Sequence, residues 1–178
     1  TEATGRGVMI TCREALKKLG MRPEETRVVV QGSGNVGGIG ALLLHREGYK
    51  IISLSDMYGA IHNPNGLDVP AVLKHIRENG RRLEGYPDAE HIPNSEQLEL
   101  DCDLIVPAAT ENQITTENVD RIKAKLIVEG ANGPTSPNAE ALRAERGVPV
   151  VPDRVANAGG VISSYFEWAQ NHQRMVWD

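Results

Sequence analysis

Short apolar runs alternate along this chain with longer segments in which apolar residues recur every three or four positions. Runs with few polar residues in their interior are typical of strands that are covered on both faces of a parallel sheet. They lie at Arg27–Gln31, Lys50–Leu54, Leu104–Val106, Leu126–Glu129 and Val148–Val151. Strand–helix alternation with short loops predicts an α/β domain: a doubly wound, Rossmann-type, mostly parallel sheet with helices on both faces.

The intervening segments carry helical spacing and helix-boundary residues. The expected helices are Val8–Leu19, Val36–Arg46, Val69–Asn79, Ala139–Arg146 and Val161–Gln170. Gly20 and Gly80 follow two of them as C-terminal stops, and Asp68 precedes one as an N-cap. Ser136 or Asn138 is the corresponding cap of the helix at Ala139.

The length of 178 residues fits one domain, 1–178, which we divide into an opening helix (1–20), a Rossmann core (26–152) and a C-terminal helix (153–178). The net charge of −5 is spread along the chain, so neither nucleic acid nor a membrane surface is an expected partner. No apolar run is long enough to span a bilayer, and Cys12 and Cys102 suit buried, reduced thiols. We expect a cytoplasmic protein, and the first residue, which is not Met, suggests a piece of a longer one.

The segment VVVQGSGNVGG (Val28–Gly38) contains the pattern G-x-G-x-x-G between an expected strand and an expected helix. In that context the glycines allow a tight turn, close approach of a pyrophosphate and close helix packing, while the helix N-terminus attracts the phosphates. The alternative is a tight structural turn. The candidate cofactor-binding residues are Gly32, Ser33, Gly34, Asn35, Val36 and Gly37.

Asp56 ends the second expected strand, at about the spacing of the acid that binds the adenine-side ribose. A carboxylate there accepts hydrogen bonds from the free hydroxyls of NAD and repels the 2′-phosphate of NADP. No Arg or Lys lies within Ser55–His62, so a cation would have to reach in from elsewhere. NAD is therefore the expected cofactor, with NADP left open.

Five segments together resemble the cofactor-binding domain of the Glu/Leu/Phe/Val dehydrogenase family, and of its glutamate dehydrogenases in particular. They are TEATGRGV (Thr1–Val8), VVVQGSGNVGG, DLIVPAATENQIT (Asp103–Thr115), VEGANGPTSPNA (Val128–Ala139) and VPDRVANAGGVISSYFEWAQN (Val151–Asn171). They cover essentially the whole chain in the family's order. One departure is Ser33, where many relatives carry a bulky aromatic residue.

The resemblance implies roles for further cofactor-binding residues. Thr4 is similar to the residue that binds the nicotinamide carboxamide, and Ala109 and Asn112 to contacts of the nicotinamide-side ribose. Asn132 is similar to another contact beside the nicotinamide, and the resemblance implies that Asn157 lies where cofactor and substrate meet. A cap or a turn is the alternative for each of them taken alone.

The resemblance also implies L-glutamate and 2-oxoglutarate as substrates. The Gly-Gly helix start would lie under the substrate, and the hydroxyl of Ser164 would bind the side-chain carboxylate of glutamate; the expected substrate-binding residues are Asn157, Gly159, Gly160, Val161 and Ser164. The leucine and phenylalanine enzymes have an apolar residue in place of Ser164. A hydrogen bond from this hydroxyl to the preceding turn is the structural alternative.

The reaction implied is oxidative deamination with hydride transfer to the nicotinamide, and it needs a Lys and an Asp. In the family both lie on a substrate domain that precedes Thr1, so we expect no catalytic residue in this chain. The five histidines are scattered and no metal-ligand spacing is found, so no metal is expected. The isolated chain should bind cofactor without turnover.

The family is typically hexameric, so the parent protein is expected to be a homo-hexamer. Its substrate domain does most of the assembly, so the isolated chain is expected to be a monomer or weak dimer with apolar surface exposed over Val161–Trp177. Three alternatives remain. They are the cofactor domain of a leucine, phenylalanine or valine dehydrogenase, a non-catalytic dinucleotide-sensing module, and an S-adenosylmethionine-binding domain.

Overall fold

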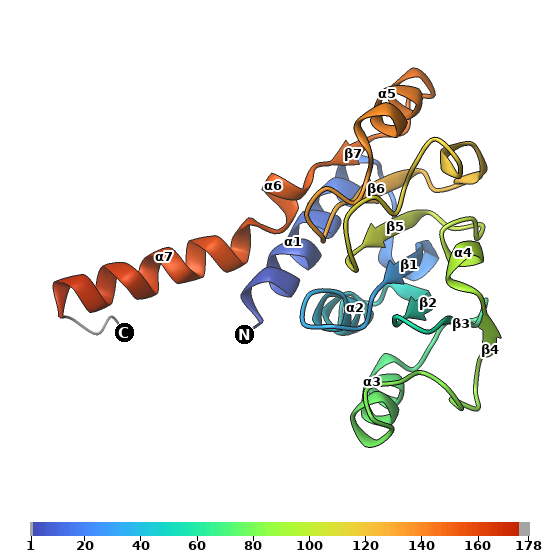
Figure 1. Cartoon of the computed structure of the whole chain (residues 1–178), viewed down its shortest axis with the longest axis horizontal. Helices are drawn as coiled ribbons and strands as arrows, with labels where there is room; N and C mark the ends of the chain where they lie inside the picture. The colour runs from blue at the N-terminus through green and yellow to red at the C-terminus, as the bar shows by residue number, and fades with distance from the viewer. Residues whose placement is uncertain (1, 175–178) are drawn as a thin grey trace.

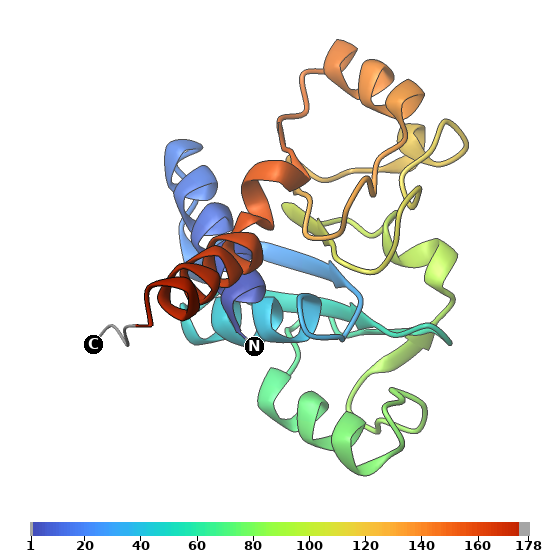
Figure 2. The same ribbon diagram turned by 60° about the vertical axis from the view of Figure 1, so that its left-hand side comes forward.

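The computed structural model describes residues 2–174 and shows one sheet of seven strands with helices on both faces (Figures 1 and 2). The strand order is β4-β3-β2-β1-β5-β6-β7. The strands are β1 (Arg27–Gln31), β2 (Lys50–Ser55), β3 (Ala60–His62), β4 (Glu90–Ile92), β5 (Leu104–Pro107), β6 (Leu126–Val128) and β7 (Val150–Val151). The predicted fold class is confirmed.

Parallel pairing joins β1 to β2 and β5, β5 to β6, and β6 to β7. The two short strands β3 and β4 pair antiparallel at one edge, and the sequence pattern did not predict them. Strand order reverses at β1, because the chain runs outward to β2 and then returns to β5 on the other side. Ligands of doubly wound sheets bind at such a point, outside the carboxyl ends of the strands.

The unbroken apolar strands are explained by two buried clusters, one on each face. Val28 and Val30 of β1 pack into the cluster that contains residues of α1 (Ala3–Lys18), α2 (Gly37–Arg46) and α3 (Val69–Glu78). Val29 points the other way, into the cluster that contains Ala139 of α5 (Pro137–Glu145). Successive side chains of β1 therefore point to opposite faces of the sheet, and neither face is exposed to solvent.

The remaining helices are short or lie at the end of the chain. They are η1 (Pro23–Glu25), α4 (Asn94–Gln97), η2 (Val119–Arg121), α6 (Asp153–Ala156) and α7 (Ala158–Gln173). The predicted boundaries hold where capping is local: the Asp68 carboxylate accepts from the backbone N–H of Ala71, and Ser136 accepts from that of Ala139. Gly20 and Gly80 have positive φ angles, as C-terminal stops require.

Helix α1 begins at Ala3, five residues before the predicted start, because neighbouring helices hold its glycine-containing first turn. A Cβ atom on Gly5 would lie 2.8 Å from the Cβ of Ile39 in α2, and one on Gly7 would lie 3.4 Å from the Cα of Gly159. Glycine has a low helix propensity, and the packing of α1 against α2 and α7 compensates for it. Cys12, farther along the same helix, is buried with a free thiol.

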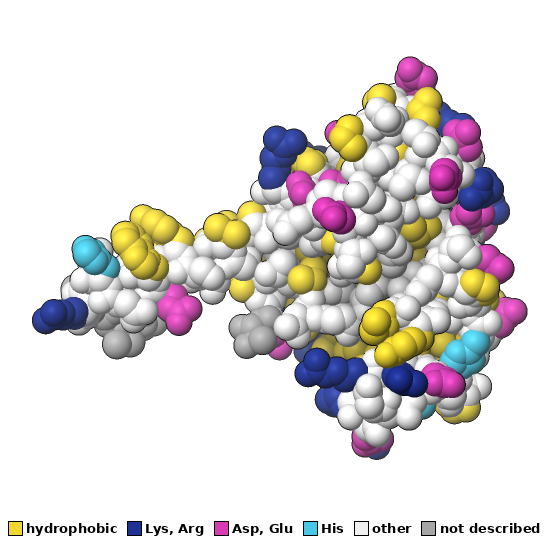
Figure 3. Space-filling model, in the orientation of Figure 1, with side chains coloured by type: hydrophobic (Ala, Val, Ile, Leu, Met, Phe, Trp, Pro, Cys, Tyr) yellow, Lys and Arg dark blue, Asp and Glu magenta, His cyan; other side chains and the backbone are white. Residues whose placement is uncertain are grey.

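Helix α7 projects from the body of the molecule and buries none of its side chains (Figure 1). Its exposed residues include Val161, Ile162, Tyr165, Phe166 and Trp168, which form part of the apolar surface visible along it in Figure 3. The predicted exposure of this segment is confirmed as far as residue 174, whereas Trp177 lies outside the described residues. Across residues 2–174, no helix has the length and apolar character needed to cross a membrane.

Candidate functional site: two adjoining cavities at the carboxyl ends of the strands

The glycine-rich loop between β1 and α2 meets three geometric requirements of a pyrophosphate site. Gly32 has a φ of 95°, and a Cβ there would lie 2.9 Å from the carbonyl oxygen of Ala108. A Cβ on Gly37 would lie only 1.9 Å from the carbonyl oxygen of Gly32, whereas one on Gly34 would meet nothing within 4 Å. Gly32 and Gly37 therefore close the turn, and Gly34 leaves its outer side free for a ligand.

The N-terminus of α2 receives no side-chain cap, although α3 and α5 are both capped. Its N-cap residue is Val36, which has no side-chain acceptor. Uncapped N–H groups and the positive end of the helix dipole favour a phosphate at this position. The residues present therefore fit a dinucleotide pyrophosphate.

A cavity of about 830 Å³ extends from this loop toward β2 and α3, and we call it the first cavity. Six of the predicted cofactor residues line it: Gly32, Ser33, Gly34, Asn35, Asp56 and Ala109. Its lining also includes residues that the sequence did not single out, namely Gln31, Met57, Leu73, Ile76, Arg77, Arg81, Asn94, Thr110 and Gln113.

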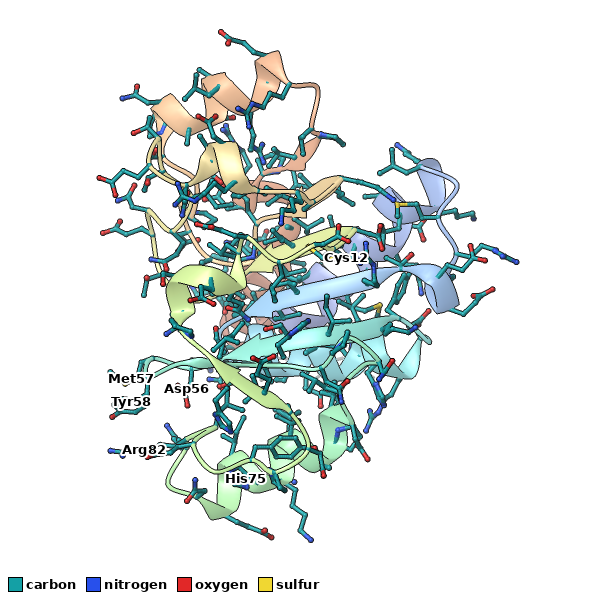
Figure 4. The ribbon with its side chains drawn as sticks, turned by 90° about the vertical axis from the view of Figure 1, so that its right-hand side faces the viewer. Cys12, Asp56, Met57, Tyr58, His75 and Arg82 are labelled. Atoms are coloured by element: carbon teal, nitrogen blue, oxygen red, sulfur yellow. The ribbon has the colours of Figure 1, made fainter. Side chains whose placement is uncertain are left out.

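The Asp56 carboxylate lines the first cavity but is largely engaged by the protein itself. One of its oxygens accepts from the backbone N–H groups of Tyr58, at 2.7 Å, and Gly59, at 3.1 Å. The other accepts from the N–H of Leu83 at 2.7 Å. Figure 4 shows Asp56 with Met57, Tyr58 and Arg82 at this edge of the molecule. The use of Asp56 as a ribose acceptor stays a prediction.

A second cavity, of about 860 Å³, lies between the N-terminus of α1, the loops after β5 and β6, and the start of α7. The sequence-predicted residues that line it are Thr4, Val36, Ala109, Asn132, Asn157, Gly160, Val161 and Ser164. These residues come from segments far apart in the chain. The amide of Asn157 donates to the side-chain oxygen of Asn132 at 2.8 Å, so the two predicted cofactor contacts hold each other in place.

Two carboxylates fix the loop that carries Asn132. The N–H of Gly133 donates to Asp153 at 2.9 Å, and the N–H of Asp153 donates to Glu129 at 3.1 Å. The carbonyl of Gly133 in turn accepts from the N–H of Asn112 at 3.0 Å. The loops after β5 and β6 and the start of α6 are therefore joined in one network behind the second cavity.

Three predicted site residues line neither cavity. Asn112, with a φ of 53°, contributes through its backbone to the loop network. Gly37 lies behind the glycine loop, and a Cβ on Gly159 would lie 2.4 Å from the carbonyl oxygen of Ala3. Gly159 is thus explained by the crossing of α1 and α7, while a Cβ on Gly160 would meet the hydroxyl of Thr4 at 2.3 Å.

Most of the lining of the second cavity consists of hydroxyl, amide and apolar groups, which bind ligands through hydrogen bonds and apolar contacts. Glu111 is the one ionisable side chain among the described residues that line it. The hydroxyl of Ser164 makes no hydrogen bond within residues 2–174, so the predicted alternative, bonding to the preceding turn, is not observed there. Nor do three His, Cys, Asp or Glu side chains come together in this part of the chain as a metal site would require.

The fold and the two cavities define a dinucleotide-binding domain of the Rossmann type. The family model "Glutamate/Leucine/Phenylalanine/Valine dehydrogenase" matches residues 1–178, and the chain belongs to this family. It is 51% identical to a glutamate dehydrogenase of Thermotoga maritima over 178 residues, and 47% identical to an NAD-specific glutamate dehydrogenase of Staphylococcus aureus over 175. These alignments cover 99% and 98% of this chain.

A solved structure agrees with these sequence relatives. The hetero-hexameric glutamate dehydrogenase from Thermus thermophilus, in a Leu-bound form, superposes with a TM-score of 0.88 at 32% identity, covering 99% of this chain and 41% of that one. The chain spans 42% of the length of each of the two sequence relatives. The predicted family is confirmed.

Proposed function

We propose that this chain is the NAD(P)-binding part of a glutamate dehydrogenase, which deaminates L-glutamate oxidatively to 2-oxoglutarate and ammonia. The observation that carries the proposal is the second cavity. There Thr4, Asn132, Asn157 and Ser164 converge beside the glycine loop, which a domain that only sensed the adenine half of a dinucleotide would not need. The nicotinamide accepts the hydride when it is bound.

The polar groups of the second cavity suit the two ligands that we assign to it. Hydroxyl and amide side chains orient a neutral carboxamide and a ribose without placing a charge beside the migrating hydride. The free hydroxyl of Ser164, one turn inside α7, donates to the far carboxylate of glutamate. The absence of a side chain at Gly160 allows α7 to approach the hydroxyl of Thr4, because a Cβ atom there would lie 2.3 Å from it.

The proton-transfer groups come from elsewhere in the parent protein. Nothing that lines the second cavity among residues 2–174 pairs a cation with a carboxylate, so the Lys and Asp belong to the remaining part of the parent. We therefore propose that the isolated chain binds dinucleotide without turning over. In the parent, the exposed apolar residues of α7 meet that remaining part, and closure excludes water from the cleft.

The same proposal covers cofactor, assembly and location. NAD is proposed as a cofactor, and the similarity to the NAD-specific glutamate dehydrogenase of S. aureus supports it. The whole chain is proposed to form one dinucleotide-binding domain with three parts, 1–20, 26–152 and 153–178. The parent is proposed to be a cytoplasmic homo-hexamer, and the isolated chain a monomer or weak dimer, to be checked by sedimentation.

The substrate assignment is tested by Ser164→Ala in the full-length parent, with Ser163→Ala as the matched control. Ser163 is its exposed neighbour on α7 and lines neither cavity. Loss of one hydrogen bond to a carboxylate should raise the KM for glutamate about tenfold, with the KM for the dinucleotide unchanged. Equal glutamate KM values in the two variants would show that Ser164 does not bind glutamate. Turnover of leucine or phenylalanine above glutamate would favour the apolar amino-acid enzymes instead.

A further inference from the structure

Helix α6 lies between two parts of the second cavity. On one side it packs on α1, at the point where α7 leaves the body of the molecule (Figure 1). On the other side it faces the loop 130–135, which carries Asn132. Within residues 2–174, two hydrogen bonds join this loop to α6 and the start of α7, one from Gly133 to Asp153 and one from Asn157 to Asn132. The alignment of the loop with α7 therefore depends on these two bonds.

Asp153, the first residue of α6, is bonded in three directions. One carboxylate oxygen accepts from the N–H of Gly133 at 2.9 Å, and the other accepts from the N–H of Arg154 at 2.6 Å. Its own N–H donates at 3.1 Å to the carboxylate of Glu129, which follows β6 and is 8% exposed. Hydrogen bonds to an ionised carboxylate are stronger than those between neutral groups. Asp153 thus attaches α6 both to the end of β6 and to the loop.

The other bonds of this loop lead to the β5 side of the sheet. The N–H of Gly130 donates to the carbonyl of Pro107 at 3.0 Å, and the carbonyl of Gly133 accepts from the N–H of Asn112 at 3.0 Å. These backbone bonds fix the loop relative to the sheet but not relative to α6. Without the carboxylate of Asp153, only the amide pair of the second cavity would still join the loop to the helices.

That amide pair is the group whose orientation Asp153 controls. Asn157 donates to the side-chain oxygen of Asn132 at 2.8 Å, and both residues line the second cavity. The amide nitrogen of Asn132 and the amide oxygen of Asn157 make no other hydrogen bond in the described part of the chain, so one donor group and one acceptor remain for a ligand. A carboxamide such as that of nicotinamide carries the complementary acceptor and donor.

We propose that Asp153 is a positioning residue for the nicotinamide half of the dinucleotide. It lines neither cavity, so it acts through the loop and α6 and not by contact with a ligand. Its carboxylate holds Gly133 against α6 and thereby keeps the amide pair in register. This inference rests on the proposed function of a nicotinamide dinucleotide site.

The test is isothermal titration calorimetry of the 178-residue chain with NADH and with ADP-ribose, which has the adenine and pyrophosphate but no nicotinamide. The variants are Asp153→Ala, which removes both acceptors, and Asp153→Asn, whose amide oxygen can still accept from Gly133. Asp120→Ala is the control, since the Asp120 carboxylate is exposed, pairs with Arg146 and lines neither cavity.

The unmodified chain should bind NADH more tightly than ADP-ribose. Asp153→Ala should lose about tenfold in NADH affinity with ADP-ribose affinity nearly unchanged, whereas Asp153→Asn and the control should stay within about threefold for both ligands. Equal weakening of both ligands by Asp153→Ala would show a merely structural role and overturn the inference, as would unchanged NADH binding. If neither ligand bound to a chain shown by far-UV circular dichroism to be folded, the proposed function itself would fail.

Discussion

The two glycines at positions 34 and 37 stand three residues apart in one loop, yet the structure predicts opposite outcomes for the same substitution. Gly37→Ala should lower the free energy of unfolding and impair the fold. Gly34→Ala should leave the fold intact and impair dinucleotide binding. The contrast follows from what surrounds each Cβ position, a backbone carbonyl in one case and open space in the other.

The magnitudes come from those surroundings. A methyl group on Gly37 would start 1.9 Å from the Gly32 carbonyl oxygen, and contacts under 3.0 Å are essentially never seen. The loop would have to open by roughly 1 Å against Ala108, an overpacking that costs about 3 kcal/mol or a fall of roughly 6–12 °C in Tm. Gly34 has no positive φ, so alanine there should change stability by less than about 1 kcal/mol.

The assay pairs urea unfolding, followed by far-UV circular dichroism, with an NADH titration of both variants. Gly34→Ala should bind NADH about tenfold or more weakly, because its methyl group occupies the position of the pyrophosphate. The explanation of the loop would be refuted by a Gly37→Ala variant as stable as the unmodified chain. It would equally be refuted by a Gly34→Ala variant that binds NADH normally.

Three further predictions concern stability. Asp103 is buried and bonded to Lys125 at 2.8 Å; burial acts to raise the pKa of its carboxyl, but Lys125 and other donors outweigh it, so the pKa lies below its usual range. Asp103→Asn should therefore lower the free energy of unfolding by about 3 kcal/mol above roughly pH 4, and by progressively less as the pH falls through the lowered folded-state pKa. Urea titrations from pH 7 to pH 3 that gave a constant difference between the two proteins would contradict this. The Cβ atom introduced by Gly159→Ala would lie 2.4 Å from the Ala3 carbonyl oxygen, so this substitution should lower Tm and reduce the hydrogen-exchange protection of the α1 amides. Unchanged protection would show that α1 and α7 do not depend on this crossing. Arg143→Met should raise Tm by about 2–4 °C, because two guanidinium nitrogens are buried without partners, and a fall in Tm in calorimetry would mean that the charge is compensated.

The strands of the fold were predictable because burial on both faces leaves a plain trace in the sequence. Val28, Val29 and Val30 belong to two different clusters, and no alternation with polar residues survives. Strands β3 and β4 leave no such trace, since each has three residues and pairs at the sheet edge. The early start of α1 was hidden by its glycines, whose contacts with α2 and α7 cannot be inferred from local propensity.

Part of the candidate site could likewise be predicted from the sequence, and part could not. The glycine loop follows from local sequence, and the resemblance to a family supplied Thr4, Asn132, Asn157 and Ser164, which the structure brings to one cavity. The presence of Arg81 in the lining of the first cavity could not be inferred, because the loop that carries it is attached by a long-range bond between Leu83 and Asp56. The close contact of Gly159 with Ala3 could not be inferred, since the sequence does not reveal that α1 crosses α7 at this point.

The projection of α7 has an optical consequence. The chain has two tryptophans, of which Trp177 lies outside the described residues. Trp168 lies on α7, is 60% exposed and is stacked on His172. The hydrophobic clusters beneath the sheet and above it contain no tryptophan, while buried Tyr49 and Tyr86 mark the folded body. The emission of Trp168 therefore hardly senses unfolding of the sheet and responds instead to whatever covers α7, so it reports on docking, whereas the buried tyrosines report on folding.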